Sequence, residues 1–206
     1  RGLGDVYKRQ GVNNCNNEAD VMKSVEEATD RAVNAQVEKN LFLGEYKERI
    51  IKALTFEEIK EKGIYYEIEE ALENKDVAKM VISRHAEFED IKKYIEIAKK
   101  KKISYKMIDN LACSGQIALV VVAKDAIIHE AGDEIVVTSK LEKFHLKHLS
   151  DAYYEAMENS ICNFHMDIIK KEMPEYAQNY KELTFMDKLF GARCPICQKL
   201  GGKKRG

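Results

Sequence analysis

The fold is constrained most by a stretch between about Leu41 and Thr138, in which short β-branched segments alternate with helical patterns. The segment IALVVVA at 117–123 is continuously apolar, which is typical of a strand buried on both faces. Residues 87–102 form the clearest helical pattern, with apolar side chains spaced three and four apart at Phe88, Ile91, Tyr94, Ile95 and Ala98. Strands that alternate with helices predict an α/β domain with a largely parallel or mixed sheet.

The same stretch predicts where individual elements lie. Strands are expected at 49–54, 78–83, 103–108, 117–123 and 134–138, which gives a sheet of about four to five strands. Thr55 and Glu58 have the spacing of a capping box, so a short helix should begin there and end near Gly63. A further helix is expected over 65–74.

Outside this stretch the chain divides into flanking parts. Residues 1–19 are expected to be a disordered or artefactual N-terminus, and 20–40 a peripheral helix, because few of its apolar residues are large. After the domain at 41–138, a helical extension is expected at 139–190, followed by a basic tail at 191–206. The extension should contain one long helix, 146–173, ended by Pro174, and a short helix over 181–190. The stripe on the long helix consists of Tyr154, Met157, Ile161, Phe164 and Ile168. It should pack on the domain, and the alternative is the seam of a homodimer.

Charge and composition exclude several classes of protein. The 34 basic and 35 acidic residues give a formal net charge of −1, which argues against a general polyanion binder. The run at 117–123 is far too short to span a bilayer, so no membrane partner is expected. Five cysteines without a dense disulfide spacing favour a reducing, cytoplasmic setting.

The opening residues 1–10, RGLGDVYKRQ, do not resemble a helix start, a strand or a signal peptide. Residues 5–10 can be written back as GAT GTG TAT AAG AGA CAG, which resembles the mosaic-end adapter of a transposase used to prepare sequencing libraries. We therefore leave this segment out of the reasoning about the fold.

A family resemblance emerges in the segment NLFLGEYKERIIKAL. Leu41-Phe42-Leu43-Gly44, then Glu48-Arg49 and an apolar stretch, resemble the start of the YueI-like family, and the order of elements through VAKD at 122–125 is similar as well. The resemblance covers roughly residues 40–138. It implies an α/β/α sandwich like that of the ribosomal proteins related to L7Ae and L30e, and it brings no known catalytic residues.

That implied fold raises the question of RNA binding. Relatives that bind kinked RNA use a Gly-x-Asn-Glu-x-x-Lys motif, whose place here would be near 63–73. Gly63 is present, but the Asn and the Lys are absent, and the segment carries Glu67, Glu69, Glu70 and Glu73. Four carboxylates facing a phosphate backbone would repel it. RNA contact would then have to use the lysines of 99–102 and a disordered basic tail.

The strongest chemical motif is CPIC, Cys194 to Cys197, which is half of a tetrahedral zinc site. Cys162 and His165 are candidates for the second half, since residues i and i+3 share one face of a helix. Three alternatives stay open: zinc shared between two chains through their CPIC pairs, a thiol-redox pair, and two ordinary thiols. The redox reading is weakened because QKLGGKKRG is expected to be too short and Gly-rich for a helix.

The sequence therefore predicts a non-catalytic binding or regulatory module, whose partner is a protein or a small ligand. An RNA-associated protein and a zinc-binding or thiol-redox protein are the alternatives. No nucleophile triad, HExxH or phosphate-binding loop is present in the sequence, so an enzyme is the less favoured reading.

Overall fold

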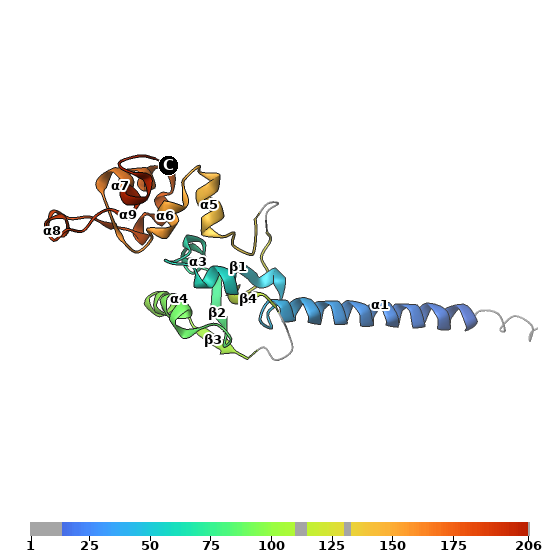
Figure 1. Cartoon of the computed structure of the whole chain (residues 1–206). Coiled ribbons are helices and arrows are strands. Elements are labelled where there is room, and N and C mark those ends of the chain that lie inside the picture. Colours follow the sequence, from blue (N-terminus) through green and yellow to red (C-terminus); the bar gives the residue numbers. More distant parts are fainter. Residues whose placement is uncertain (1–13, 110–114, 130–132, 206) are drawn as a thin grey trace, which may run out of the picture.

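The structure, a computed structural model, describes residues 14–109, 115–129 and 133–205. Figure 1 shows an α/β unit in the middle, a helical C-terminal unit at one end, and a long helix that projects from the other end. This helix, α1 (Asn14–Leu41), begins six residues before the predicted start at Asp20. The adapter-like residues 1–10 lie outside the described residues.

The α/β unit is built on a four-stranded mixed sheet with the order β1-β4-β2-β3. The strands are β1 (Ile50–Thr55), β2 (Val77–Ser83), β3 (Tyr105–Ile108) and β4 (Ile117–Ala123). β4 pairs antiparallel with both β1 and β2, whereas β3 is parallel to β2. All seven residues of β4 are buried, which confirms the sequence interpretation of 117–123 as a central strand.

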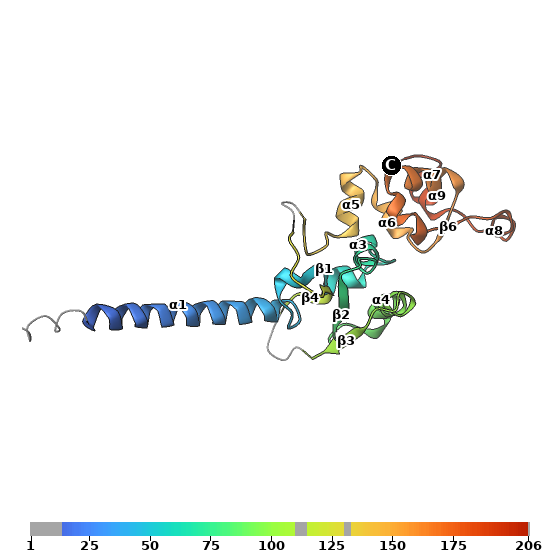
Figure 2. The same ribbon diagram turned by 180° about the vertical axis from the view of Figure 1, so that it is seen from behind.

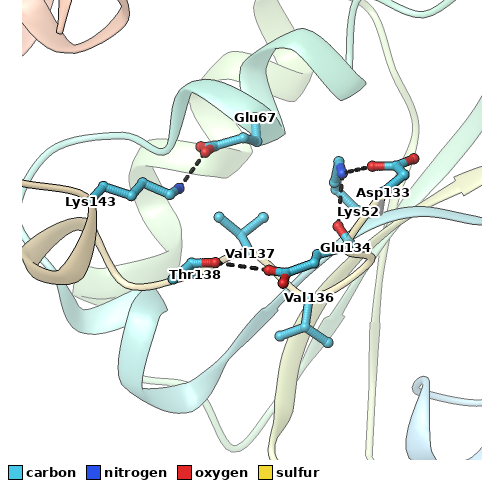
Figure 3. A pocket seen from close by; sticks show the side chains of 8 residues that line it. All are labelled: Lys52, Glu67, Asp133, Glu134, Val136, Val137, Thr138 and Lys143. Atoms are coloured by element: carbon cyan, nitrogen blue, oxygen red, sulfur yellow. Dashed lines mark hydrogen bonds and ion pairs between the residues drawn. The ribbon is translucent and has the colours of Figure 1, made fainter. Parts of the chain in front are cut away.

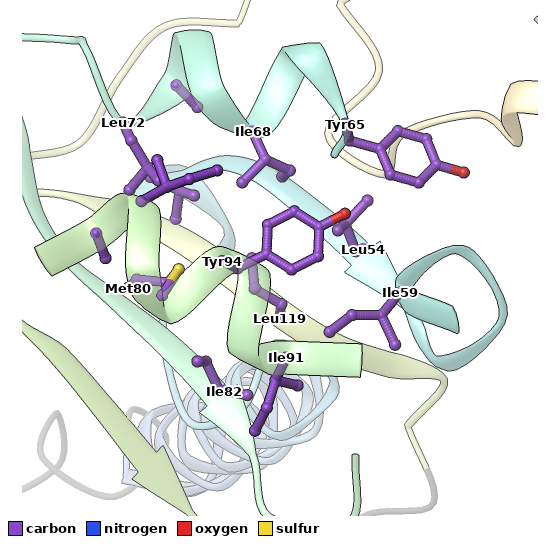
Figure 4. Close-up of a cluster of buried hydrophobic side chains, with 14 of the residues drawn as sticks. Leu54, Ile59, Tyr65, Ile68, Leu72, Met80, Ile82, Ile91, Tyr94 and Leu119 are labelled. Carbon is purple, nitrogen blue, oxygen red and sulfur yellow. The ribbon is translucent and has the colours of Figure 1, made fainter. Parts of the chain in front are cut away.

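Three helices cover one face of the sheet: α2 (Phe56–Lys60), α3 (Tyr66–Ala71) and α4 (Phe88–Lys100). Their apolar side chains meet those of the strands in the main core, where Tyr94 and Ile91 of α4 lie against Leu119 of β4 (Figure 4). The opposite face is covered by Leu43 and Phe42, just after α1, and by Ile135. An α/β fold with a mixed sheet is thus confirmed.

The predicted capping box forms at the junction of β1 and α2. The Thr55 hydroxyl accepts hydrogen bonds from the backbone N–H groups of Glu57 and Glu58, and the Glu58 carboxylate accepts one from the Thr55 N–H. This cap satisfies N–H groups that would otherwise lack partners in the first turn of a five-residue helix.

The predicted strand at 134–138 is wrong in extent. This segment makes only an isolated parallel bridge between Val136 and Ala53 of β1, where Ile135 and Val137 exchange hydrogen bonds with the Ala53 backbone. The pairing of β1 with β4 is irregular on both sides of Ala53. Beyond Val137 the chain leaves β1 for the next helix, where the Lys140 N–H donates to the Glu61 carboxylate and the Tyr65 hydroxyl (3.2 Å each).

The predicted single helix 146–173 is also wrong. The C-terminal unit has α5 (Lys140–Leu146), α6 (Asp151–Glu155) and α7 (Asn163–Glu172), with the two-residue strand β5 (Ser160–Ile161) between α6 and α7. The helical path breaks at Glu158, which has a φ of +67°. Met157 and Ile161 of the predicted stripe are buried inside this unit. The seam on which the homodimer prediction rested is therefore not present.

The rest of the unit is short and irregular. A 3-10 helix, η2 (Pro174–Asn179), begins at Pro174, and β6 (Lys181–Glu182) pairs in parallel with β5. α8 (Phe185–Leu189) and α9 (Pro195–Leu200) follow, and a one-turn 3-10 helix, η1 (Lys47–Arg49), precedes β1. No helix within the described ranges is long and apolar enough to cross a membrane.

Gly63 lies where the two units meet. Its N–H donates to the Glu158 carboxylate (2.9 Å), and the neighbouring Ile64 N–H donates to the Asn179 side chain (3.3 Å). Gly63 has a φ of +69°, and a Cβ placed there would be 2.8 Å from Cγ of Asn179. The junction thus requires glycine for both its backbone conformation and its close approach to Asn179.

Substitution of Gly63 by alanine should destabilise the protein more than the same change at Gly191. Gly191 has a similar φ of +86° but nothing within 4 Å of an added Cβ, so it isolates the backbone strain. We expect a loss of about 1 kcal/mol in the free energy of unfolding for Gly191→Ala and about 2–3 kcal/mol for Gly63→Ala. Urea unfolding followed by circular dichroism measures both, and equal losses would contradict a tight contact at Gly63.

Candidate metal centre

Two helix starts bring the four predicted ligands together. Cys162 is the N-cap of α7 and His165 lies in the first turn of that helix. Cys194 is the N-cap of α9, Pro195 is its first residue, and Cys197 follows one turn later. The predicted absence of a helix after CPIC is wrong, because α9 packs through the fully buried Ile196 against the rest of the unit.

The four ligand atoms all lie within 4.8 Å of one another. The imidazole Nδ1 of His165 is 3.3 Å from the Cys162 sulfur and 3.5 Å from the sulfurs of Cys194 and Cys197. The sulfurs of Cys162 and Cys197 are 3.6 Å apart. Within the described part of the chain, this is the group of side chains that is arranged to hold a metal ion.

These separations match the edges of a zinc tetrahedron. Zinc binds cysteine sulfur at about 2.3 Å and histidine nitrogen at about 2.0–2.1 Å, so a regular tetrahedron has S···S edges of about 3.8 Å and S···N edges of about 3.6 Å. The four separations of 3.3–3.6 Å differ from these values by only a few tenths of an ångström, and all six lie within 4.8 Å. A Cys₃His set of this size can therefore surround one ion after small movements of the side chains.

The tautomer of His165 is set by the C-terminal tail. Its Nε2 is 2.9 Å from the backbone carbonyl oxygen of Lys204. A carbonyl oxygen only accepts hydrogen bonds, so Nε2 must carry a hydrogen, and the lone pair of the neutral ring is left on Nδ1, which faces the three sulfurs. A carbonyl partner on the second nitrogen is typical of metal-ligating histidines.

The site is closed to solvent on most sides. His165 is fully buried, Cys162 and Cys194 are buried, and Cys197 is half-buried. The rings of Tyr153 and Phe164 pack edge-on against His165. Four protein ligands in a closed setting are typical of structural zinc sites, whereas catalytic zinc keeps one position open for water or substrate.

The pKa values of the Cys194 and Cys197 thiols are shifted in opposite directions. Burial raises the pKa of the Cys197 thiol to about 12, and hydrogen bonds with the sulfurs of Cys162 and Cys194 add to that shift. Burial acts in the same direction on Cys194, but backbone N–H groups of Cys162 and Cys197 directed at its sulfur outweigh it and lower the pKa of this thiol. N–H groups turned toward sulfur favour the thiolate, which is the form that binds metal.

The tail was expected to be disordered, but it packs against the C-terminal unit. Lys199 forms an ion pair with Glu155, and Arg205 pairs with Glu172 (3.3 Å). The Lys204 carbonyl that orients His165 belongs to this tail. Sequence reasoning missed this contact because any residue type offers a backbone carbonyl, so no side-chain signal marks it.

A second candidate site is a cavity of about 230 Å³ beside β1 (Figure 3). The charged side chains that line the cavity interact with one another. Lys52 pairs with Asp133 and Lys143 pairs with Glu67. The Thr138 hydroxyl donates to Glu134 (2.9 Å). These pairs neutralise both lysines and leave the Glu134 carboxylate without a cation among the lining residues, so the cavity offers a ligand no unpaired positive charge. The cysteine and histidine cluster is the stronger candidate.

The place expected for a kink-turn RNA motif is covered by the C-terminal unit. Gly63 contacts Asn179, Glu67 accepts from the hydroxyl of Tyr176 (3.1 Å), and Glu69 accepts from Gln178 (2.7 Å). The carboxylates of 63–73 thus bind other parts of this chain.

Comparison with known proteins shows to which family the chain belongs. A family model described as a protein of unknown function, DUF1694, matches residues 18–133, from α1 to just beyond β4. The chain belongs to this family. The uncharacterized protein YueI of Bacillus subtilis (strain 168) is 27% identical over 93 residues, which cover 45% of this chain and 70% of YueI. The crystal structure of YueI from Bacillus subtilis matches with 24% identity and a TM-score of 0.47, over 50% of this chain and 79% of that one.

The family match includes α1, which was expected to be only peripheral, and ends before the metal candidates. All four candidate ligands lie after residue 133, in the C-terminal unit. The family match therefore does not include the cysteine and histidine cluster.

Proposed function

We propose that the protein is a non-catalytic binding module whose C-terminal unit is held together by one structural zinc ion, bound by Cys162, His165, Cys194 and Cys197. The observation that carries the proposal is the match between the sulfur and nitrogen separations and the edges of a Cys₃His zinc tetrahedron. The choice of zinc over other metals follows from the soft thiolate ligands and the tetrahedral arrangement.

The proposed role of the ion is to join distant parts of the unit. It would connect the start of α7 to the start of α9, and with them the tail residue Lys204. The unit has short helices and two-residue strands, and two of the proposed ligands, Cys162 and Cys194, are part of its core. Small domains of this kind commonly depend on a metal for folding. Thiolate ligands also require reducing surroundings, and we propose the cytoplasm as that setting.

Thiol-redox activity is the alternative from the same residues. It would use a pair of the three sulfurs, such as those of Cys162 and Cys197, which are 3.6 Å apart. The zinc proposal is favoured because a redox pair needs no third thiol and no imidazole nitrogen aimed at both sulfurs. RNA binding has weaker support, since Lys199 and Arg205 are paired with carboxylates of the chain itself.

Metal analysis tests the proposal. The protein, purified in reducing buffer without chelator, should contain one zinc ion per chain by inductively coupled plasma mass spectrometry. Cys194→Ser should lower this content at least about tenfold, because each missing ligand weakens a structural zinc site strongly. Cys15→Ser, in α1 at the other end of the molecule, is the matched control and should keep the metal. Metal-free wild-type protein, with thiols that cycle to a disulfide, would support the redox alternative instead.

A further inference from the structure

The segment around α8 forms a finger that projects from the C-terminal unit, and it carries large apolar side chains in solvent (Figure 1). Phe185, Met186, Leu189 and Phe190 are 78%, 55%, 68% and 81% exposed. At 100° per residue these four positions share one side of the helix, while Asp187 and Lys188 lie on the other. A cluster of exposed apolar side chains of this size marks an interaction surface.

The finger is ordered by its own contacts. A capping box joins Thr184 and Asp187, with the Asp187 carboxylate accepting from the Thr184 N–H (2.8 Å) and hydroxyl (2.7 Å). At its base β6 pairs with β5. The apolar side is therefore presented on a fixed turn of helix, so little conformational entropy is lost on binding.

The charges around the finger are mainly positive. Glu182 is paired with Lys170 (2.6 Å), and Asp187 is used in the capping box. Lys181, Lys188 and Arg193 form no ion pair with any described residue. A fitting partner should combine apolar side chains with a negative rim.

α1 offers such a surface at the other end of the molecule. Val33, Val37 and Leu41, spaced four apart, are 55%, 54% and 47% exposed. Asp30 lies one turn before Val33 on this side, whereas by helical spacing Lys39 lies on the opposite side and Arg31 on the flank between them. The whole helix has six acidic and three basic residues.

α1 is exposed over the middle of the helix. Every residue from Glu27 to Val37 is exposed. Helices in proteins gain most of their stability from packing one face against other elements. The exposed apolar side of this described stretch is therefore expected to receive a partner.

We propose that a second copy of this chain is that partner, with the α8 finger of each copy bound to the α1 face of the other in an antiparallel dimer. α1 and α8 lie at opposite ends of the molecule (Figures 1 and 2). In the proposed two-fold dimer the copies lie antiparallel, so each contact occurs twice and no unpaired copy of either surface is left for further growth. An anionic membrane would also attract the finger, but it would repel the acidic α1 and leave it uncovered.

Light scattering coupled to gel filtration tests the dimer on metal-replete full-length protein. The wild type should elute with twice the 23.6 kDa chain mass at about 100 µM, because a contact of this modest size gives micromolar affinity. The finger variant Phe185→Ser/Phe190→Ser and the α1 variant Val33→Lys/Val37→Lys should each be monomeric. Lysine keeps a high helix propensity, so α1 should stay helical by circular dichroism. Phe88→Ser, at a phenylalanine that is 61% exposed on α4, is the control and should remain dimeric.

A mixture of the two monomeric variants separates this arrangement from other dimers. The finger variant retains a normal α1 and the α1 variant retains a normal finger, so the mixture should recover a one-to-one heterodimer with one of the two contacts. A finger variant that stays dimeric would instead indicate an α1-to-α1 contact, and an α1 variant that stays dimeric would indicate finger-to-finger contact. A monomeric wild type that sediments with phosphatidylserine vesicles would overturn the proposal in favour of a membrane.

Discussion

Removal of the metal is expected to unfold the C-terminal unit while the α/β unit stays folded. The core of the C-terminal unit is a separate cluster, which contains Cys162 and Cys194 themselves, whereas the sheet has its own cores on its two faces. Without the proposed zinc ion, as in Cys162→Ser, the start of α7 is no longer joined to the start of α9, and the remaining elements are short. We expect the unit to lose about 4 kcal/mol or more of stability, the scale of a tightly bound structural ion.

Hydrogen–deuterium exchange resolves the two units. In Cys162→Ser, or in wild-type protein treated with a strong zinc chelator, the amides of α7 and α9 should exchange about a thousandfold faster, as a loss of about 4 kcal/mol requires. Amides of β2 and β4 should keep their protection. Unchanged protection of α7 and α9 in metal-free protein would show that the unit is held by its apolar core alone.

Truncation of Lys140 is expected to give the second large effect, by loosening the contact between the units. Lys140 is at the start of α5, and its side chain is fully buried. Its ammonium group donates to the backbone oxygens of Lys62 (2.7 Å) and Gly63 (3.3 Å) and lies 3.9 Å from the centre of the Tyr65 ring. Lys140→Ala should lower the free energy of unfolding by about 2–4 kcal/mol, because it leaves a cavity and two unpaired carbonyl groups.

Lys140→Met is the matched control, since it keeps most of the volume and removes the charge. We expect a smaller loss than for alanine, because the cavity is avoided and no ammonium group has to be buried. Urea unfolding followed by circular dichroism gives both values. Equal losses for methionine and alanine would show that packing of the side chain contributes little.

The same residue should make stability depend on pH. Burial, with a contribution from the nearby charge of Lys93, lowers the pKa of Lys140 from its ordinary value of 10.5 to about 7. Glu61, Glu67 and Lys143 also face the group, and the two carboxylates act in the opposite direction. Between pH 7 and 10.5 the unfolded chain binds more protons at this residue than the folded chain does, so its contribution to stability rises with pH over that range.

The contribution of Lys140 is isolated by comparing wild type with Lys140→Met at two pH values. The difference in the free energy of unfolding between wild type and Lys140→Met should increase in favour of wild type from pH 7 to pH 9. Other titrating groups act on both proteins and cancel in this difference. A difference that is constant or that falls over this range would mean that Lys140 keeps its ordinary pKa in the folded protein.

Much of the α/β unit could be predicted because its signals are local. The apolar run at 117–123, the capping box at Thr55 and the apolar side of 87–102 each depend on residues within one element, and each is found as expected. The break in 146–173 could not be seen, since Met157 and Ile161 are buried between α6 and α7 although they lie in neither helix, so their spacing resembles that of a helical stripe. The failure of 134–138 as a strand depends on tertiary contacts, such as those of the Lys140 N–H with Glu61 and Tyr65.

The sequence indicated the four candidate ligands but not their arrangement in space. Cys162 and His165 were expected to share the side of a long helix, whereas Cys162 actually precedes α7 and caps it. The approach of CPIC to this point depends on the fold of the intervening segment 174–193, for which spacing gives no rule. The carbonyl of Lys204 could not be predicted at all, because it is a main-chain group brought in by tertiary packing.

X-ray absorption spectroscopy at the zinc edge determines whether the proposed zinc ion is bound by three sulfurs and one nitrogen. We expect a shell of three sulfur atoms at about 2.3 Å and one nitrogen at about 2.0–2.1 Å. His165→Cys should convert this shell to four sulfurs. A shell of nitrogen and oxygen alone, or a wild-type protein that takes up no zinc, would rule out the Cys₃His zinc site.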